Sequence, residues 1–293
     1  MEENKGIDKN QIAGFLLIGA IMLGFLWWNS SNAPEVQPES STEVVEEVAA
    51  DALSEDAKPA LEVEAVADSN AFTAQQVTIS NAELSLTFSS AGASLTSAAL
   101  ADYHTYDDTA KTEALDLVKG NSQVFDLQLP GGDALSAKEF EIVSSAPRSV
   151  VFSDGTTKVS IELAEVGYDY SFVVTGTANA TGKPELYWER SAQRTEKGIS
   201  TERQYSSFVY QVTEDGDVEH LAGRGSDDSE ATEPINWLAQ KQRFFSLIVH
   251  PEQGFTTANI ATVNGDDKNE NLIKEYTATA TLNQTVSGAY TLP

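Results

Sequence analysis

The sequence contains no cysteine, so it can form no disulfide and offers no thiolate for catalysis or metal binding. Its three histidines, His104, His220 and His250, share no spacing typical of metal ligands. Basic residues are also scarce: 18 lysines and arginines stand against 45 acidic residues, a formal net charge of -27. Because nucleic-acid binding depends on basic contacts to phosphate, this balance argues strongly against a nucleic-acid partner.

Sequence motifs of common enzyme classes are absent as well. There is no G-x-x-x-x-G-K phosphate loop, no G-x-S-x-G nucleophile elbow and no H-E-x-x-H zinc motif. The acidic turns around Asp215 and Asp266 resemble calcium loops in composition but lack the D-x-[DN]-x-[DN]-G register, so we expect hairpin tips there. We therefore predict a protein that is not an enzyme, with no catalytic, cofactor-binding or metal-binding residue.

One long hydrophobic run is present, close to the N-terminus. Residues 12–28 are apolar on all faces, and no charged residue lies between Lys9 and Glu35. At about 1.5 Å per residue the run covers roughly 25 Å, near the lower limit for a membrane-spanning helix. The side chains that we expect to anchor it are Ile12, Phe15, Leu16, Leu17, Ile18, Ile21, Leu23, Phe25, Leu26, Trp27 and Trp28.

The residues after this run favour a retained anchor over a cleaved signal peptide. A small-x-small cleavage site ends at Ala33, but Pro34 follows it directly and is expected to block signal peptidase. Trp27 and Trp28 lie where an interfacial aromatic belt would hold the outer end of a helix. We therefore predict a transmembrane helix over residues 12–28.

Basic residues predict the orientation of this helix. Lys5 and Lys9 precede it, and the next base is Lys58. By the positive-inside rule, residues 1–11 stay in the cytoplasm and everything after Asn29 lies across the inner membrane, in the periplasm of a bacterium.

Residues 29–70 predict an acidic tether. Between Glu35 and Asp68 there are eleven acidic residues and a single base, Lys58, in a stretch rich in Ala, Val, Ser and Pro. Such a composition cannot bury enough apolar surface to offset the entropy of ordering the chain. We therefore expect the tether to be disordered and self-repelling.

Residues 71–293 are expected to form one large antiparallel β-sandwich. Apolar residues alternate in "AELSLTF" and "KVSIEL", and similar segments include "QVFDLQL", "ELYWE", "SFVYQV" and "EYTATATL". The segments "AGAS", "PGGD", "SDGT", "EDGD" and "NGDD" provide the turn residues that separate them. Two immunoglobulin-like domains are the alternative organisation.

The segment "EPINWLAQKQRFFSLIVHPEQGF" differs from its surroundings because bulky apolar residues accompany two of the few bases. One interpretation is a central core strand preceded by a short irregular turn. The other is a ridge that faces a partner, since aromatic residues beside exposed bases are typical of interfaces. The candidate contact residues are Trp237, Lys241, Arg243, Phe244 and Phe245.

The order of these parts resembles a known family. The run "NQIAGFLLIGAIMLGFLWW", the acidic tether, the opening "VTISNAELSLTFSSAGASLTSAALADYHTY" and the later "INWLAQKQRFFSLIV" resemble the first helix and large periplasmic domain of the YidC/Oxa family of bacterial membrane protein insertases. The long acidic tether is most similar to versions from Bacteroidetes. The resemblance spans essentially the whole chain.

The resemblance implies a twisted β-supersandwich similar to galactose mutarotase, in a machine that inserts nascent inner-membrane proteins, alone or with the Sec translocon. Family members also have five further helices that form a hydrophilic groove with a buried arginine. No second apolar run of spanning length follows Trp28, and Arg190, Arg194 and Arg203 belong to the β domain. We therefore expect an N-terminal fragment, truncated within the late strands, that acts in docking or scaffolding.

Two other functions remain open at this point. A sandwich of this kind on a membrane tether could be a carbohydrate-binding or mutarotase-like module, which would need a histidine acid and a carboxylate base facing one cleft. A single-pass adhesion subunit that merely projects a domain is the other alternative, and without a cysteine it could not be a lipoprotein.

Overall fold

A computed structural model describes residues 72–292, except residue 121. The membrane helix, the tether and all eleven anchor residues predicted above lie outside the described residues. The described residues belong to one compact unit, Ala67–Pro293. Within them, strands predominate and no helix is long and apolar enough to cross a membrane.

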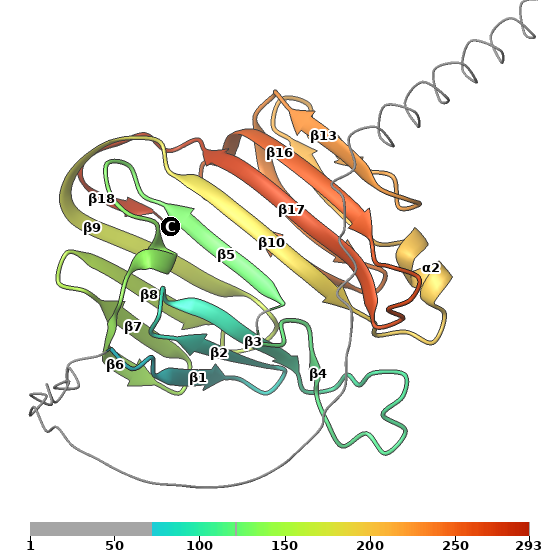
Figure 1. Ribbon diagram of the computed structural model, residues 1–293. Helices are drawn as coiled ribbons and strands as arrows, with labels where there is room; N and C mark the ends of the chain where they lie inside the picture. The colour runs from blue at the N-terminus through green and yellow to red at the C-terminus, as the bar shows by residue number, and fades with distance from the viewer. Residues whose placement is uncertain (1–71, 121, 293) are drawn as a thin grey trace, which may run out of the picture. The chain divides into compact units, whose positions relative to one another are not determined.

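The strands form three antiparallel sheets (Figure 1). The four-stranded sheet has the order β1 (Gln76–Ser80), β2 (Leu84–Ser89), β3 (Ser94–Leu100) and β4 (Leu115–Asp116). The five-stranded sheet has the order β18 (Val286–Leu292), β9 (Tyr170–Gly182), β8 (Thr157–Leu163), β7 (Ser149–Ser153) and β6 (Glu141–Ala146).

The third and largest sheet has nine strands. Its main path is β12 (Val218–His220), β11 (Ser207–Val212), β14 (Ile235–Gln242), β16 (Phe255–Asn264), β17 (Leu272–Leu282), β10 (Glu185–Gln193) and β5 (Gln123–Gln128). Off this path, β13 (Asp227–Ala231) pairs with β16, and β15 (Phe245–Val249) pairs with β14. Between residues 72 and 292 the helical elements are a 3-10 turn at Leu135–Ala137 and the short helix α2 (Ile199–Gln204).

Alternation in the sequence explains why these segments are strands. In β17, Tyr276, Ala278, Ala280 and Leu282 are buried, while the threonines between them are less buried, and β8 alternates in the same way. A period of two places one set of side chains on the core face of a sheet. The prediction of a mainly β, antiparallel sandwich is confirmed.

Glycine-rich and acidic segments form the turns, as expected. "AGAS" joins β2 to β3, and "SDGT" joins β7 to β8. The turns that contain Asp215 and Asp266 join β11 to β12 and β16 to β17, so both are hairpin tips. Gly92 in the first of these turns has a φ of 70°, and a Cβ there would lie 2.9 Å from the Cα of Ser136, so a side chain would be strained as well as crowded.

Aromatic side chains connect the sheets into one core. The ring centroid of Phe125 in β5 lies 5.8 Å from that of Phe172 in β9, and the Phe125 ring also meets Trp188 in β10. The four-stranded sheet contacts the five-stranded sheet through Phe88 in β2, whose ring centroid lies 6.3 Å from that of Tyr170 in β9. Edge-to-face pairs of this kind add to the stabilisation from burial alone.

Candidate functional site

The segment singled out from the sequence forms a hairpin of β14 and β15. Gln242 pairs with Phe245, so Arg243 and Phe244 form a two-residue turn. The interpretation as a central core strand holds for β14, which is largely buried inside the large sheet, but the segment also contains a second strand, because the chain reverses at Arg243, which has a φ of 24°. Tight hairpin turns favour Asn-Gly, since their central residues need positive φ, and an Arg-Phe turn gives no such signal.

The tip of this hairpin presents Arg243 and Phe244 together. Phe244 is 64% exposed, and the guanidinium carbon of Arg243 lies 4.6 Å from the centroid of its ring. An arginine over an aromatic face is held by the ring quadrupole. The tip therefore combines one half-buried cation with one exposed, large apolar side chain.

The other three candidate residues lie away from the tip or are partly covered. Phe245 is half-buried and meets Tyr103 edge-on, with ring centroids 5.2 Å apart. Lys241 Nζ donates to the Tyr205 carbonyl at 3.0 Å. Trp237 Nε1 donates to Gln211 Oε1 at 3.1 Å, and it lies roughly 20 Å from the tip at about 3.3 Å per strand residue. The five residues thus do not form one exposed ridge.

A buried polar network supports the base of the tip. Arg190 Nη2 donates to Gln242 Oε1 at 2.9 Å, and Gln242 Nε2 donates to Glu202 Oε1 at 2.7 Å. Arg190 Nε also donates to the Leu117 carbonyl at 3.1 Å. Arg190, Gln242 and Glu202 are all buried, and burial lowers the pKa of Arg190 to about 10. The network joins β10, α2 and β14.

Glu202 closes this network at α2. Its carboxylate accepts hydrogen bonds from the backbone N–H and hydroxyl of Thr195 at 3.0 and 2.7 Å, and from the N–H of Glu196 at 3.1 Å. No sequence pattern indicates this arrangement, because arginine and glutamate at strand and helix positions usually face solvent.

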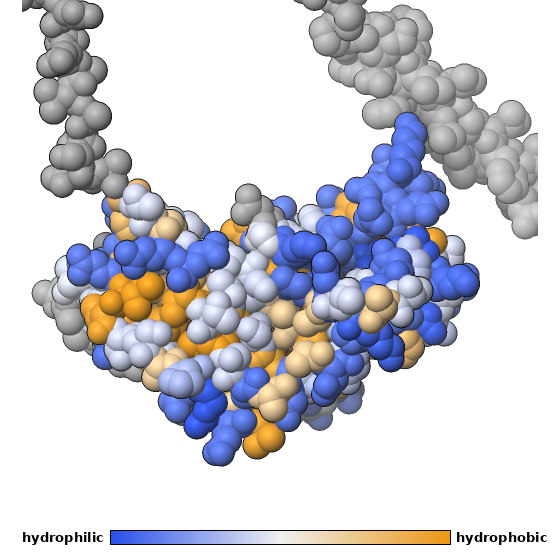
Figure 2. Space-filling model, turned by 90° about the horizontal axis from the view of Figure 1, so that it is seen from below, coloured by the Kyte–Doolittle hydropathy of each residue, from blue (hydrophilic) through white to orange (hydrophobic). Residues whose placement is uncertain are grey.

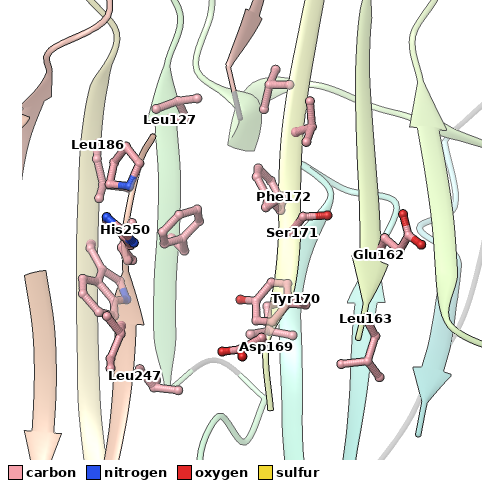
Figure 3. Close-up of a pocket in the computed structure, with 18 of the residues that line it drawn as sticks. Leu127, Glu162, Leu163, Asp169, Tyr170, Ser171, Phe172, Leu186, Leu247 and His250 are labelled. Atoms are coloured by element: carbon pink, nitrogen blue, oxygen red, sulfur yellow. The ribbon is translucent and has the colours of Figure 1, made fainter. Parts of the chain in front are cut away.

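A groove of about 990 Å³ lies beside β15, between the large sheet and the five-stranded sheet. Leu247 and His250 stand on one side of it, and Asp169, Tyr170 and Phe172 stand on the other (Figure 3). The lining is mostly apolar, with aromatic rings from both sheets. Figure 2 shows that hydrophobic residues reach the surface in patches between hydrophilic ones on the lower face of the domain.

Acidic residues dominate the charged part of the groove lining. Glu162, Glu165, Asp169 and Glu252 line it together with a single arginine, Arg148. All four carboxylates are on exposed residues, so they remain hydrated when the groove is empty.

The three histidines do not meet in the structure. His250 lines the groove, whereas His104 Nδ1 lies 2.6 Å from the Glu113 carbonyl oxygen in the β3–β4 connection, and His220 ends β12. Within the described part of the chain, no group of three or more acidic or histidine side chains could hold a metal ion.

Sequence comparison relates the chain to curated proteins named membrane protein insertase YidC. It is 26% identical to the protein from Phocaeicola vulgatus over 94% of this chain and 48% of that protein. Identity to the Bacteroides fragilis protein is 28%, over 93% of this chain and 47% of that one, and to the Parabacteroides distasonis protein 24%, over 94% and 49%. The chain thus spans about half the length of these relatives. No protein-family model matches it.

Solved structures with a similar fold include a putative aldose 1-epimerase from Escherichia coli K12. It is 12% identical, with a TM-score of 0.46 over 75% of this chain and 97% of that one. A galactose mutarotase-like protein from Lactobacillus casei is also 12% identical, with a TM-score of 0.44 over 74% and 98%. From these sequence relatives, the chain is YidC-like and similar to YidC proteins of Bacteroidetes.

Proposed function

We propose that this chain is the anchor and outer docking domain of a membrane protein insertase. In this proposal residues 12–28 span the inner membrane, residues 29–70 are the acidic tether, and the β domain that follows lies in the periplasm. The proposal is supported by the similarity to insertases over nearly the whole chain and by the apolar run next to Lys5 and Lys9. Its ultimate partners are nascent inner-membrane proteins, reached alone or with the Sec translocon.

The observation that favours docking is the hairpin tip. Arg243 and Phe244 form a strained turn. The residue before the turn, Gln242, belongs to the buried hydrogen-bonded network. Strained backbone persists only where its surroundings hold it, and it often marks functional positions. Arginine and aromatic residues are also the types that dominate binding energy in interfaces. We therefore place the partner contact at Arg243 and Phe244, with Lys241, Phe245 and Trp237 behind them.

Site-specific photocrosslinking in cells tests the docking contact. A crosslinker at Phe244 is expected to capture a Sec translocon subunit or the membrane-spanning part of an insertase. The matched control is a crosslinker at Val143 of β6, which is 57% exposed and lies on an edge strand outside the hairpin. Equal capture of the same partner at both positions, or none at Phe244, would contradict the proposal.

Cysteine labelling tests the orientation. Because the chain has no cysteine, Val143→Cys introduces a single thiol on the β domain. We expect a membrane-impermeant maleimide to label it in intact spheroplasts. Labelling only after lysis would place the domain in the cytoplasm.

A further inference from the structure

One part of the large sheet is free of acidic residues, although the β domain as a whole is acidic. Residues 72–292 contain 31 acidic and 15 basic residues. None of the acidic residues falls in residues 203–213, 221–226 or 234–251, which contain β11, the connection from β12 to β13, and the β14–β15 hairpin. The same segments contain four bases, Arg203, Arg224, Lys241 and Arg243.

The directions of the strands place the nearest acidic residues of these segments far from the hairpin tip. β11 begins, β14 ends and β15 begins beside the turn of residues 243–244. Glu214, Glu233 and Glu252 follow or precede these strands at their opposite ends. The charge on these strands therefore changes from basic at the tip to acidic at the far end.

Three of the four bases have no carboxylate partner within residues 72–292. Arg203 pairs with Asp267 at 2.7 Å, whereas Arg224, Lys241 and Arg243 form no ion pair in this part of the chain. Their positive charge is therefore not neutralised by direct contact and can act on an anionic partner.

Large apolar and aromatic side chains accompany these bases. Phe244 is 64% exposed, Ile248 62% and Tyr205 50%. Lys241 Nζ lies 5.9 Å from the centroid of the Tyr205 ring, and Lys241 shares the outer face of the sheet with Ile248, because their cross-strand pairs are two positions apart. We call Tyr205, Lys241, Arg243, Phe244 and Ile248 the tip surface.

This composition suits the interface of a phospholipid membrane. Aromatic rings favour the headgroup level, and lysine or arginine near an anionic membrane is attracted to its lipids. Long basic side chains can also lie along apolar surface while their charged ends reach the phosphates. An anionic membrane repels the acidic remainder of the domain, so the tip surface is the part that can approach it.

The proposed anchor keeps a membrane within reach of this surface. In the proposed function residues 12–28 span the membrane and residues 29–70 join them to the β domain. A flexible linker of about 40 residues has a root-mean-square length of roughly 35 Å. The local concentration of lipid is therefore high, and even a weak contact is populated.

We propose that the tip surface lies on the anionic phospholipid headgroups of the membrane that anchors the chain. Tyr205, Phe244 and Ile248 enter the headgroup region, and Lys241 and Arg243 meet lipid phosphates. The contact orients the domain, with the acidic ends of β11, β14 and β15 directed away from the bilayer. The inference rests on the anchor and tether of the proposed function, and it places the tip where a membrane-embedded partner is also within reach.

Fluorescence quenching in phospholipid nanodiscs tests this contact with the full 293-residue chain. A nitrobenzoxadiazole label is attached at Ile248→Cys or at the matched control Val143→Cys, whose native residues are 62% and 57% exposed, and the quencher is a nitroxide on the lipid headgroups. With about a third of the lipid as phosphatidylglycerol, we expect at least about twofold more quenching at residue 248 than at residue 143. Equal quenching at the two positions would overturn the proposal.

Lipid composition tests the role of charge without altering the protein. Nanodiscs of phosphatidylcholine alone, or high salt, should reduce quenching at Ile248→Cys to the level of the control. Lys241→Gln combined with Arg243→Gln should do the same in phosphatidylglycerol, with urea unfolding as the check that the variant is folded. Quenching that does not depend on phosphatidylglycerol would reject the proposal.

This experiment and the crosslinking experiment can fail independently. The nanodiscs contain this chain and lipid but no Sec subunit and no other insertase, so headgroup contact in them does not come from a protein partner. Quenching at residue 248 without crosslinking at Phe244 would support lipid contact and reject protein docking. Crosslinking without quenching would support protein docking and reject lipid contact.

Discussion

The middle of the large sheet and the strands beside the groove differ in how completely their edges are paired. β10 pairs with β17 on one edge and with β5 on the other, and the inward residues of β17 are fully buried. β15 alternates in the same way, yet one edge is open and Leu247 and Val249 are only half-buried. The first region stabilises the fold through complete pairing, whereas in the second region one edge of β15 has no partner strand among the described residues.

The buried network lies in the closed region, by which we mean the fully paired middle of the large sheet. Its removal should have the largest effect on the free energy of unfolding. Arg190→Met leaves the acceptors on Gln242 and Leu117 without a donor and leaves Glu202 as a buried carboxylate without a nearby cation. Breaking a buried charged network typically costs about 3–5 kcal/mol. We expect a loss of about 3 kcal/mol in the free energy of unfolding, measured with urea.

The control for this prediction is Arg224→Met. Arg224 is exposed and donates one hydrogen bond, to Gln204 Oε1 at 3.1 Å. We expect a change within about 0.5 kcal/mol, as for most surface substitutions. If both variants lose the same stability, the network does not support the hairpin.

Lys274 in β17 should make the free energy of unfolding depend on pH. Burial lowers its pKa to about 8, and its Nζ donates to the Gly223 carbonyl at 2.8 Å. Between pH 8 and 10 the unfolded chain holds the Lys274 proton more tightly than the folded chain, so stability should rise with pH. The rise is at most about 2.5 kcal/mol, from 1.36 kcal/mol per pKa unit.

Urea unfolding of wild type and Lys274→Met across this pH range measures the effect. The difference between the two profiles isolates the contribution of Lys274 to the pH dependence of stability. If the two profiles run parallel, the pKa of Lys274 does not differ between the folded and the unfolded chain.

Substitutions of two nearby glutamines on β14, Gln240 and Gln242, should change the free energy of unfolding in opposite directions. Both are buried, but the amide atoms of Gln240 have no hydrogen-bond partner among the described residues, whereas Gln242 bonds to Arg190 and Glu202. Leaving a buried polar group unsatisfied costs about 1–3 kcal/mol. Gln240→Leu should therefore raise the free energy of unfolding, measured with urea, by about 1 kcal/mol, while Gln242→Leu should lower it. Destabilisation by both would place an unseen partner at Gln240.

The smallest expected change is at the hairpin tip. Arg243→Gly relieves the φ of 24° at no steric cost, so we expect a gain of about 0.5 kcal/mol in thermal stability. The same substitution should reduce crosslinking from Phe244, because it removes the cation. Lower stability, or undiminished crosslinking, would show that the tip is an ordinary turn.

The strands and most turns could be predicted from the sequence because their signals are local. Alternation in "KVSIEL" and "TATATL" predicts β8 and β17, and the glycines of "AGAS" and "SDGT" predict the turns between their neighbours. Each of these features depends on residues a few positions apart.

The candidate site was only partly predictable, because it depends on pairing between distant segments. The sequence identified residues 233–255 as unusual, but not the reversal at Arg243, whose positive φ is imposed by the paired strands. The network of Arg190, Gln242 and Glu202 joins three elements. Among the described residues β15 pairs with β14 alone, which no local pattern indicates.

Hydrogen exchange of the full chain tests the contrast between paired and open strand edges most directly. We predict slow exchange at the backbone amides of Trp188 and Ala278 and rapid exchange at those of Ser246 and Ile248. Slow exchange at Ser246 and Ile248, or rapid exchange at Trp188 and Ala278, would contradict the account.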